Sequence, residues 1–174
     1  MLINAAKAGE VDAFGAVYTE FLNPIFRFIC LQIRDQIEAE DLTQEVFVKA
    51  FGRLDQFGQH GNNFRAWLYQ IARTTVLDWF KKKKMVMVDD PEVVFGNLVS
   101  PHGNPLVLNL AKEQTAAIEA ALALLGHVDR EVIVLHYVND LSHAEIAEIL
   151  HISAEAVRQR KSRALRSLRA HFSQ

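Results

Sequence analysis

Apolar residues recur at helical spacing along most of the chain, and no segment shows the sustained alternation of a strand. The pattern is clearest from Asp35 onwards, where Asp35 and Glu38 form an Asp-x-x-Glu variant of the capping box that starts a helix. The apolar stripe of this helix consists of Leu42, Val46, Phe47, Ala50, Phe51 and Leu54. This periodicity predicts an all-α protein.

A loop and a second amphipathic helix follow. The segment "DQFGQHGNN" after Leu54 has the composition of a loop, and Asn63 caps the helix behind it. The stripe of this helix consists of Phe64, Trp67, Leu68, Ile71, Thr75 and Trp79, and four consecutive lysines follow it. Because Trp67 and Trp79 lie on the stripe, we assign both indoles to the core rather than to stacking on a ligand.

The pattern divides the chain into two small helical domains. Residues 85–105 hold three prolines and two glycines without a helical period, which is typical of a linker. We therefore predict a first domain over 1–84, a linker over 85–110 and a second domain over 111–174. Behind the prolines, the apolar spacing indicates helices over 106–125 and 128–138.

The second domain ends in a tight helix-turn-helix. Ser142 and Glu145 make a Ser-x-x-Glu capping box, and Ser153 caps the last helix. On a helical wheel, one side of this last helix is apolar and faces the first helix of the motif: Val157, Ala164, Leu165 and Leu168. The opposite side carries Arg158, Gln159, Ser162, Arg163 and Arg166.

Charge is segregated along the chain, although the formal net charge is only -2. The segment 154–174 has six basic residues against Glu155 alone, and four lysines close the second predicted helix. In contrast, Glu38, Asp41 and Glu45 share one helical face. The segregation predicts two kinds of partner, a basic protein surface and a polyanion.

The outward side of the last helix favours DNA as the polyanion. Arginine bonds guanine or a phosphate as a fork, and glutamine reads adenine in the major groove. In helix-turn-helix motifs the second helix is the one that enters this groove. The alternative is a basic terminal helix that only faces solvent.

Several other classes are disfavoured. No apolar run approaches the roughly 18 residues of a membrane span, and the N-terminus lacks a signal-peptide pattern, so we expect a cytoplasmic protein without membrane insertion. Cys30 is the single cysteine and lies in an apolar run, which indicates a core residue, and the seven histidines are dispersed. We expect no metal and no cofactor.

Four segments resemble one known family. "AEDLTQEVFVKAF", "FRAWLYQIARTTVLDWFKKKK", "REVIVLHYVNDLSHAEIAEILHIS" and "AVRQRKSRALRSLR" are similar, in this order, to the sigma-70 family of bacterial transcription initiation factors. More narrowly, they resemble the short extracytoplasmic-function (ECF) type. The resemblance implies a sigma-2-like domain over 1–84 and a sigma-4-like domain over 111–174. It also implies a factor that binds core RNA polymerase, recognises and melts promoters, and is not itself an enzyme.

The resemblance also implies roles for particular residues. Asp41, Gln44 and Glu45 match the surface for the clamp helices of the polymerase largest subunit. The loop after Phe57 and the next helix match the part that opens the minus-10 element, with Gln59, His60, Asn62, Asn63, Arg73 and Thr74 as candidates. The minus-35 readers are matched by Arg158, Gln159, Ser162 and Arg163, and Arg166 shares their face. His151 stands where a turn glycine is common, and an anti-sigma protein is expected as an inhibitor.

Three alternatives remain open at this point. The first is a helix-turn-helix regulator that binds DNA without being a polymerase subunit. The second is a hydrolase using Asp89, Asp90 and His102, which the lack of a metal-ligand spacing or a phosphate loop disfavours. The third is a decoy that binds polymerase without opening promoters.

Overall fold

The computed structural model describes residues 2–58, 63–89 and 112–172, of which 85–89 and 112–116 are described by their backbone only. Within these ranges every regular element is a helix, so the predicted all-α fold class is confirmed. The chain forms two compact units, Met1–Gly103 and Asn104–Gln174. Each unit has its own apolar core.

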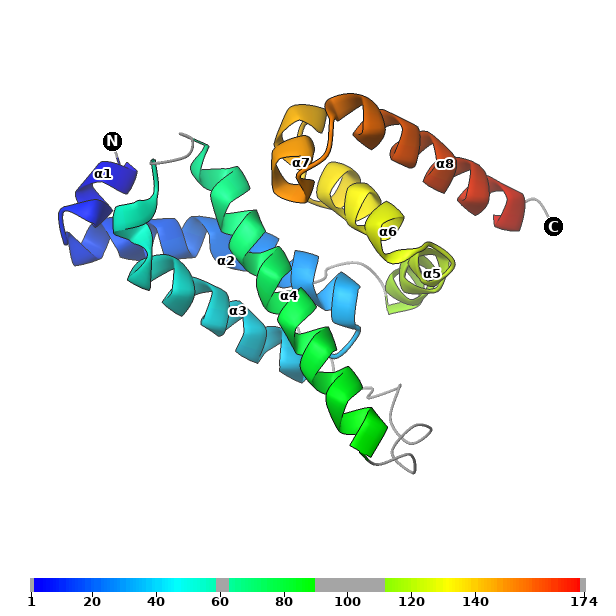
Figure 1. The fold of residues 1–174 in the computed structure, drawn as a ribbon, viewed down its shortest axis with the longest axis horizontal. Helices are drawn as coiled ribbons and strands as arrows, with labels where there is room; N and C mark the ends of the chain where they lie inside the picture. Colours follow the sequence, from blue (N-terminus) through cyan, green and yellow to red (C-terminus); the bar gives the residue numbers. More distant parts are fainter. Residues whose placement is uncertain (1, 59–62, 90–111, 173–174) are drawn as a thin grey trace. The chain divides into compact units, whose positions relative to one another are not determined.

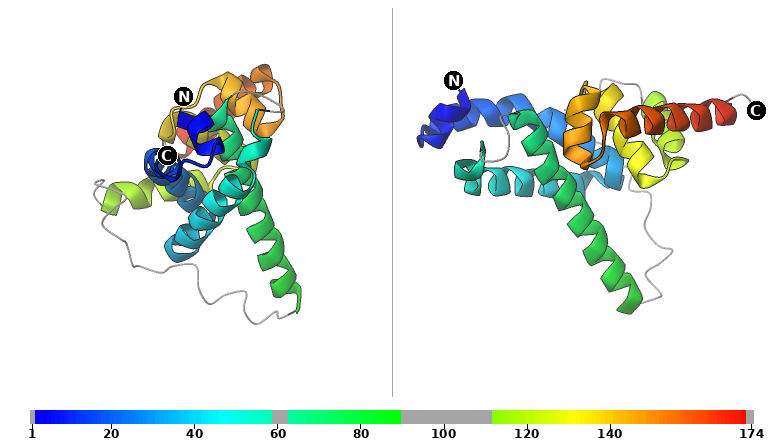
Figure 2. Two further views of the ribbon diagram at one scale, coloured as in Figure 1. Left: turned by 90° about the vertical axis from the view of Figure 1, so that its left-hand side faces the viewer. Right: turned by 45° about the horizontal axis from the view of Figure 1, so that its top comes forward.

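The first unit is a bundle built around one long helix. Its elements are α1 (Leu2–Lys7), α2 (Val11–Ile33), α3 (Gln36–Gly52), a 3-10 turn at Leu54–Gln56 and α4 (Phe64–Asp89). Helix α2 packs against α1, α3 and α4, and α4 also packs against α3 (Figure 1). The most enclosed side chains include Ile25, Phe28, Ile29, Val46, Leu68 and Tyr69. Figure 2 shows α4 crossing the α2–α3 pair, with its C-terminal end extending beyond it.

Local sequence accounts for the start of α3 in part. The Asp35 side chain accepts a hydrogen bond from the Glu38 backbone N–H at 3.1 Å, as the capping box predicts. The Glu38 carboxylate, however, accepts a hydrogen bond from the Trp79 indole N–H at 2.9 Å. Glu38 therefore joins α3 to α4.

One helix boundary and one side chain differ from the predictions. Helix α4 continues to Asp89, five residues into the segment predicted to be a linker. Phe51 was predicted to lie in the core with its stripe, but its side chain is 58% exposed. The Phe51 ring lies at the last turn of α3 and packs edge-to-face with the Phe14 ring, at a centroid distance of 4.7 Å.

The second unit ends in the predicted helix-turn-helix. Its elements are α5 (Lys112–Ala123), α6 (His127–Ile133), a π-helical turn (Val134–Val138), α7 (His143–Leu150) and α8 (Ala154–Phe172). Helix α8 packs on α6 and α7, and Figure 2 shows α7 beside the start of α8. The core includes Val132, Leu135, Leu141, Ile146, Ile149 and Val157.

The caps of α7 and α8 follow the local sequence. Ser142 and Glu145 form a complete capping box, and Ser153 Oγ accepts a hydrogen bond from the Ala156 N–H at 3.1 Å. His151 closes α7 in the left-handed conformation, with φ 54° and ψ 44°. This is the conformation for which a helix C-terminus usually selects glycine, so His151 performs the turn at some backbone cost.

Candidate functional site

The two sides of α8 separate as the helical wheel predicts. Val157 and Ala164 are buried, and Leu165 and Leu168 are half-buried. All five predicted DNA-reading residues are exposed: Arg158, Gln159, Ser162, Arg163 and Arg166. The orientation of the helix is therefore confirmed, while the contact of these residues with DNA stays a prediction.

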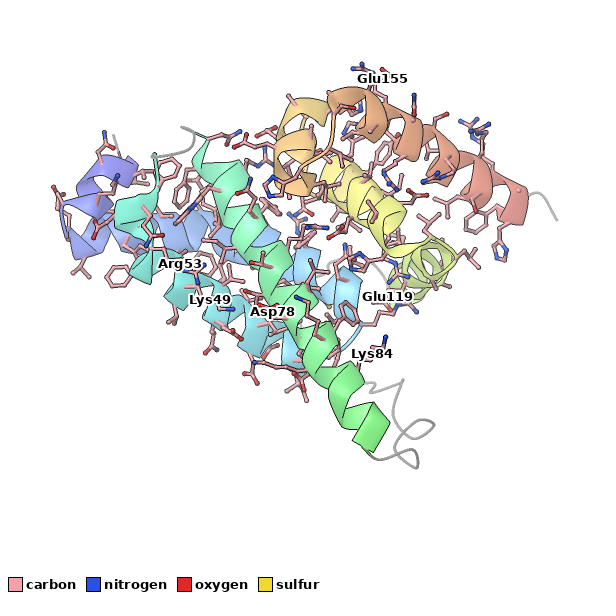
Figure 3. All side chains as sticks on the ribbon, viewed as in Figure 1. Lys49, Arg53, Asp78, Lys84, Glu119 and Glu155 are labelled. Atoms are coloured by element: carbon pink, nitrogen blue, oxygen red, sulfur yellow. The ribbon has the colours of Figure 1, made fainter. Side chains whose placement is uncertain are left out.

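A carboxylate on α8 itself contacts two of these residues. Glu155 lies on the outer side of the first turn of α8 (Figure 3). Its Oε2 accepts hydrogen bonds from Arg158 Nη2 at 2.6 Å and Nε at 2.9 Å, and its Oε1 accepts from Gln159 Nε2 at 3.4 Å. The hydrogen bond from Arg158 and its charge lower the pKa of Glu155. Because both side chains are more than half exposed, the pair adds little stability.

A second carboxylate, from α6, contacts α8 from outside the helix. Asp129 Oδ2 accepts from Arg163 Nε at 2.8 Å, and Asp129 Oδ1 accepts from Arg163 Nη2 at 2.8 Å. Arg160 Nη1 donates to the same Oδ1 at 3.1 Å. The hydrogen bond from Arg163 lowers the pKa of Asp129, which outweighs the opposing effect of burial. The same bond raises the pKa of Arg163.

Sequence reasoning missed Asp129. The contact joins residues 34 positions apart, so no periodicity along the chain reveals it. The only local signal is the position of Asp129 in the first turn of α6, where an acidic residue favours the helix dipole in any case.

Two histidines, His136 and His143, stack on each other, and His136 contacts Lys161 of α8. The rings of His136 and His143 stack with a centroid distance of 4.9 Å and an interplanar angle of 24°. His136 Nδ1 lies 3.0 Å from the Leu141 carbonyl oxygen, and His136 Nε2 lies 3.3 Å from Lys161 Nζ.

The surroundings of His143 disfavour its protonated form. For His143, burial lowers the pKa below the ordinary 6.5, and the charges of Lys161, His136 and Arg158 lower it further. This site opposes any additional positive charge.

The exposed face of α3 combines apolar and polar side chains. The exposed residues Ile37, Asp41, Gln44, Val48 and Phe51 follow one another at spacings of four and three. Ile37, Val48 and Phe51 are 64%, 71% and 58% exposed. This spacing is that of the seam along which one helix packs against another in a coiled coil. Sequence reasoning placed Asp41 and Gln44 here but missed Ile37 and Val48, whose signal was this spacing.

The three acids predicted to share a face of α3 are not equivalent. Asp41 is exposed. Glu45, the third of the predicted polymerase-binding residues, is partly exposed and forms a 2.7 Å ion pair with Lys49, which Figure 3 labels on the same helix. Glu38 is half-buried against Trp79. The acidic character of the outer face therefore rests mainly on Asp41 and Glu45.

Of the residues predicted for the minus-10 element, Asn63 lies at the start of α4, and Arg73 and Thr74 lie within it. Asn63 Oδ1 accepts from the Ala66 N–H at 3.1 Å, so Asn63 caps α4 as predicted. Arg73 is half-buried and Thr74 is exposed, with the Thr74 hydroxyl donating to the carbonyl of Ile71 at 2.9 Å or of Gln70 at 3.1 Å. Gln59, His60 and Asn62 lie outside the described residues.

Both tryptophans are half-buried, so their assignment to the core holds only in part. Trp67 packs in an aromatic cluster with Phe57 and Phe64, at centroid distances of 5.5 Å to each ring. Trp79 donates its indole N–H to Glu38, and Lys83 Nζ lies 4.4 Å from the Trp79 ring centroid. These contacts hold both indoles in place from within the first unit.

Other kinds of site find no support in the described ranges. Three or more potential metal-ligating side chains come together nowhere in them. The helices there are too short or too polar to cross a membrane. Of the residues considered for a hydrolase, Asp90 and His102 fall outside the described part, and Asp89 ends the backbone of α4.

Comparison with known proteins matches both units. Residues 17–85 match the family model for sigma-70 region 2, and residues 121–170 match that for sigma-70 region 4. The chain is 33% identical over 168 residues to the ECF RNA polymerase sigma factor BldN of Streptomyces coelicolor, covering 96% of this chain and 63% of BldN. It is 31% identical over 174 residues to the ECF RNA polymerase sigma factor SigW of Bacillus subtilis, covering 96% of this chain and 92% of SigW.

A solved structure is similar over nearly the whole chain. It is the sigma factor RpoE in complex with the anti-sigma factor NepR from Bartonella quintana, with a TM-score of 0.77 and 26% identity. The match covers 94% of this chain and 98% of RpoE.

Proposed function

The chain belongs to the sigma-70 family, among the RNA polymerase sigma factors of the ECF type, and we propose that it directs core RNA polymerase to promoters and helps to melt them. The observation that supports the proposal is that each of the two matched sigma-70 regions contains one of the exposed helix faces described above. The region 2 match, 17–85, contains the exposed face of α3, and the region 4 match, 121–170, contains the arginine-rich face of α8. One chain thus holds a protein-binding surface and a DNA-binding surface.

The face of α3 is the proposed contact with polymerase. Its seam of Ile37, Asp41, Gln44, Val48 and Phe51 suits a helical partner, and the family resemblance names the clamp helices of the largest subunit. Asp41, Gln44 and Glu45 then supply hydrogen bonds and charge that set the register. The apolar members supply most of the affinity because they lose water-exposed area on binding.

The faces of α8 and α4 are the proposed contacts with DNA. Helix α8 enters the major groove of the minus-35 element with Arg158, Gln159, Ser162, Arg163 and Arg166 outward. The loop before α4, with Gln59, His60, Asn62 and Asn63, acts at the minus-10 element together with Arg73 and Thr74 of α4. Each surface is small, so binding by either one is weak, and attachment to polymerase raises the effective concentration of the second contact.

The proposal assigns the sigma-2-like domain to 1–84, the linker to 85–110 and the sigma-4-like domain to 111–174, with α4 reaching Asp89. The factor lends specificity to polymerase without catalysing a reaction itself, and it acts in the cytoplasm, where polymerase works. An anti-sigma protein is the proposed inhibitor. The likeness to RpoE, whose solved structure contains the anti-sigma factor NepR, supports this partner.

The first test is assembly followed by melting. The protein is mixed with core polymerase, and co-elution on size exclusion is measured, followed by permanganate reactivity of thymines in promoter DNA. We expect a stable complex and reactive thymines around the minus-10 element. Co-elution without melting marks the decoy, and DNA binding without co-elution marks the simple helix-turn-helix regulator.

A further inference from the structure

Asp129 holds the side chain of a predicted DNA-reading arginine in a fixed direction. The Asp129 side chain is 15% exposed, while that of Arg163 is 59% exposed. Two parallel hydrogen bonds of 2.8 Å join the carboxylate to Nε and Nη2 of Arg163. Arg160 Nη1 bonds the same carboxylate at 3.1 Å, so Asp129 is itself held in place.

The edge that Arg163 uses toward Asp129 leaves its other edge available. A guanidinium has five N–H donors in one plane. The Nε–Nη2 edge is engaged by Asp129, and the end of the fork, formed by the second Nη2 hydrogen and Nη1, is a separate bidentate edge. That end is the arrangement in which arginine pairs with O6 and N7 of guanine. Arg163 can therefore keep Asp129 and contact a base at the same time.

Resting on the proposed function, we propose that Asp129 is a positioning residue for promoter reading, which orients Arg163 toward one base pair of the minus-35 element. A free arginine side chain loses rotamer freedom when it binds, and this loss of entropy opposes binding. Asp129 removes part of that cost before DNA arrives. Asp129 also fixes the direction of the guanidinium N–H donors. These donors therefore cannot reorient to form hydrogen bonds with a wrong base at this position.

The opposite role for the same contact is competition. A carboxylate that binds Arg163 in place of DNA lowers affinity for every sequence. The geometry favours positioning, because Arg160 anchors Asp129 on its inner side and Arg163 remains more than half exposed. The two roles predict different results for one substitution.

The test measures base discrimination by the full chain assembled with core polymerase. The DNA is the minus-35 duplex that the wild-type protein selects, with every single-base variant of that element. Arg163→Ala identifies the position that Arg163 reads. We expect Asp129→Asn to reduce discrimination at that same position by about 3- to 10-fold, part of the roughly 5- to 150-fold that a bidentate base contact provides. Discrimination at the other positions stays unchanged.

Two further variants separate positioning from loss of charge or fold. Glu119→Gln removes one negative charge from α5 of the same unit, where Figure 3 labels Glu119, and should leave discrimination unchanged. Arg163→Lys keeps the charge but loses the second edge, so adding Asp129→Asn to it should have no further effect on discrimination. Thermal unfolding of each variant checks that the second unit remains folded.

Specific results would overturn the assignment. Tighter binding of Asp129→Asn to all sequences with unchanged discrimination would show competition. An equal loss at every position would show a structural role, and a flat Arg163→Ala profile would make Arg163 a phosphate contact with no base to read. If the wild-type protein directs no promoter-dependent transcription, the proposed function fails first. If it does and Asp129→Asn discriminates like wild type, only the role of Asp129 fails.

Discussion

Helices α3 and α8 each expose one face, and the two faces have opposite chemistry. The face of α3 presents three large apolar side chains beside Asp41 and Gln44. The face of α8 presents arginines, Gln159 and Ser162, with no large apolar side chain among the exposed positions 158–167. A partner of α3 gains affinity by removing apolar area from water, whereas a partner of α8 gains it from hydrogen bonds and released counterions.

The two faces also differ in how they are held before binding. Carboxylates bond three of the proposed DNA readers, Arg158 and Gln159 through Glu155 and Arg163 through Asp129. On α3, Val48 and Phe51 protrude from the helix with no such partner to fix them by hydrogen bonds. If both faces bind as proposed, the carboxylates restrict the readers of α8 before DNA binds, whereas α3 contributes affinity through burial of its apolar side chains.

A charged residue introduced into the apolar seam of α3 should produce the largest change in binding affinity. Val48→Asp buries a carboxylate where an isopropyl group packs, so we expect polymerase affinity to fall by about 3 kcal/mol, or roughly 100-fold. The matched control is Val11→Asp, at an 80% exposed valine in the first turn of α2, where an acidic residue suits the helix dipole. Fluorescence anisotropy with labelled protein measures both. Equal affinities of the two variants would remove α3 from the interface.

Loss of one reader on α8 should produce a smaller and more selective effect. We expect Arg163→Ala to weaken recognition by about 1–3 kcal/mol at particular minus-35 bases. Arg169→Ala, which removes the same charge from the exposed C-terminal part of α8, is the control and should weaken all sequences alike. Competition binding with minus-35 variants measures the pattern. If Arg163→Ala also weakens every sequence equally, Arg163 contacts a phosphate.

The salt dependence of binding should differ between the two faces. Raising monovalent salt from about 50 to 200 mM should weaken binding of the chain to duplex promoter DNA by roughly 10- to 40-fold, if α8 neutralises two or three phosphates. Binding to polymerase through the apolar seam should change by less than about threefold over the same range. Parallel titrations measure both slopes. Equal slopes would contradict the division into an apolar and an ionic contact.

Acid should produce the smallest effect, and only in the second unit. The pKa of His143 is lowered in the folded state, so the unfolded state binds its proton first, and stability falls as the pH drops below about 6.5. We expect a loss under about 1 kcal/mol, because the imidazole is only partly shielded from solvent. Hydrogen exchange of α8 amides at pH 7.5 and 5.5, corrected for intrinsic rates, measures it. His143→Gln should abolish the difference, and an unchanged difference would assign it to another group.

Features set by neighbours in the sequence were predictable. The two faces of α8 follow from periodicity, because α6 and α7 cover one side of a regular helix. The caps at Asp35, Asn63, Ser142 and Ser153 follow from hydrogen bonds that reach three residues along the chain.

Features set by the meeting of distant segments were not predictable. Asp129 meets Arg163 only because α6 packs on α8. Glu38 turns to Trp79, 41 residues away, and leaves the acidic face on which its spacing placed it. Phe51 is exposed at the last turn of α3, although its spacing along the helix is that of a core residue. The identity of the family, by contrast, rested on four motifs in order and needed no tertiary contact.

The most direct test of a working sigma factor is run-off transcription. Purified core polymerase and this protein transcribe a library of fragments with randomised minus-35 and minus-10 elements, and the transcribed templates are sequenced. The account predicts enrichment of one defined two-part promoter, with the minus-35 part lost in Arg163→Ala. Transcripts without a sequence preference, or no transcripts from a complex that forms stably, would contradict it.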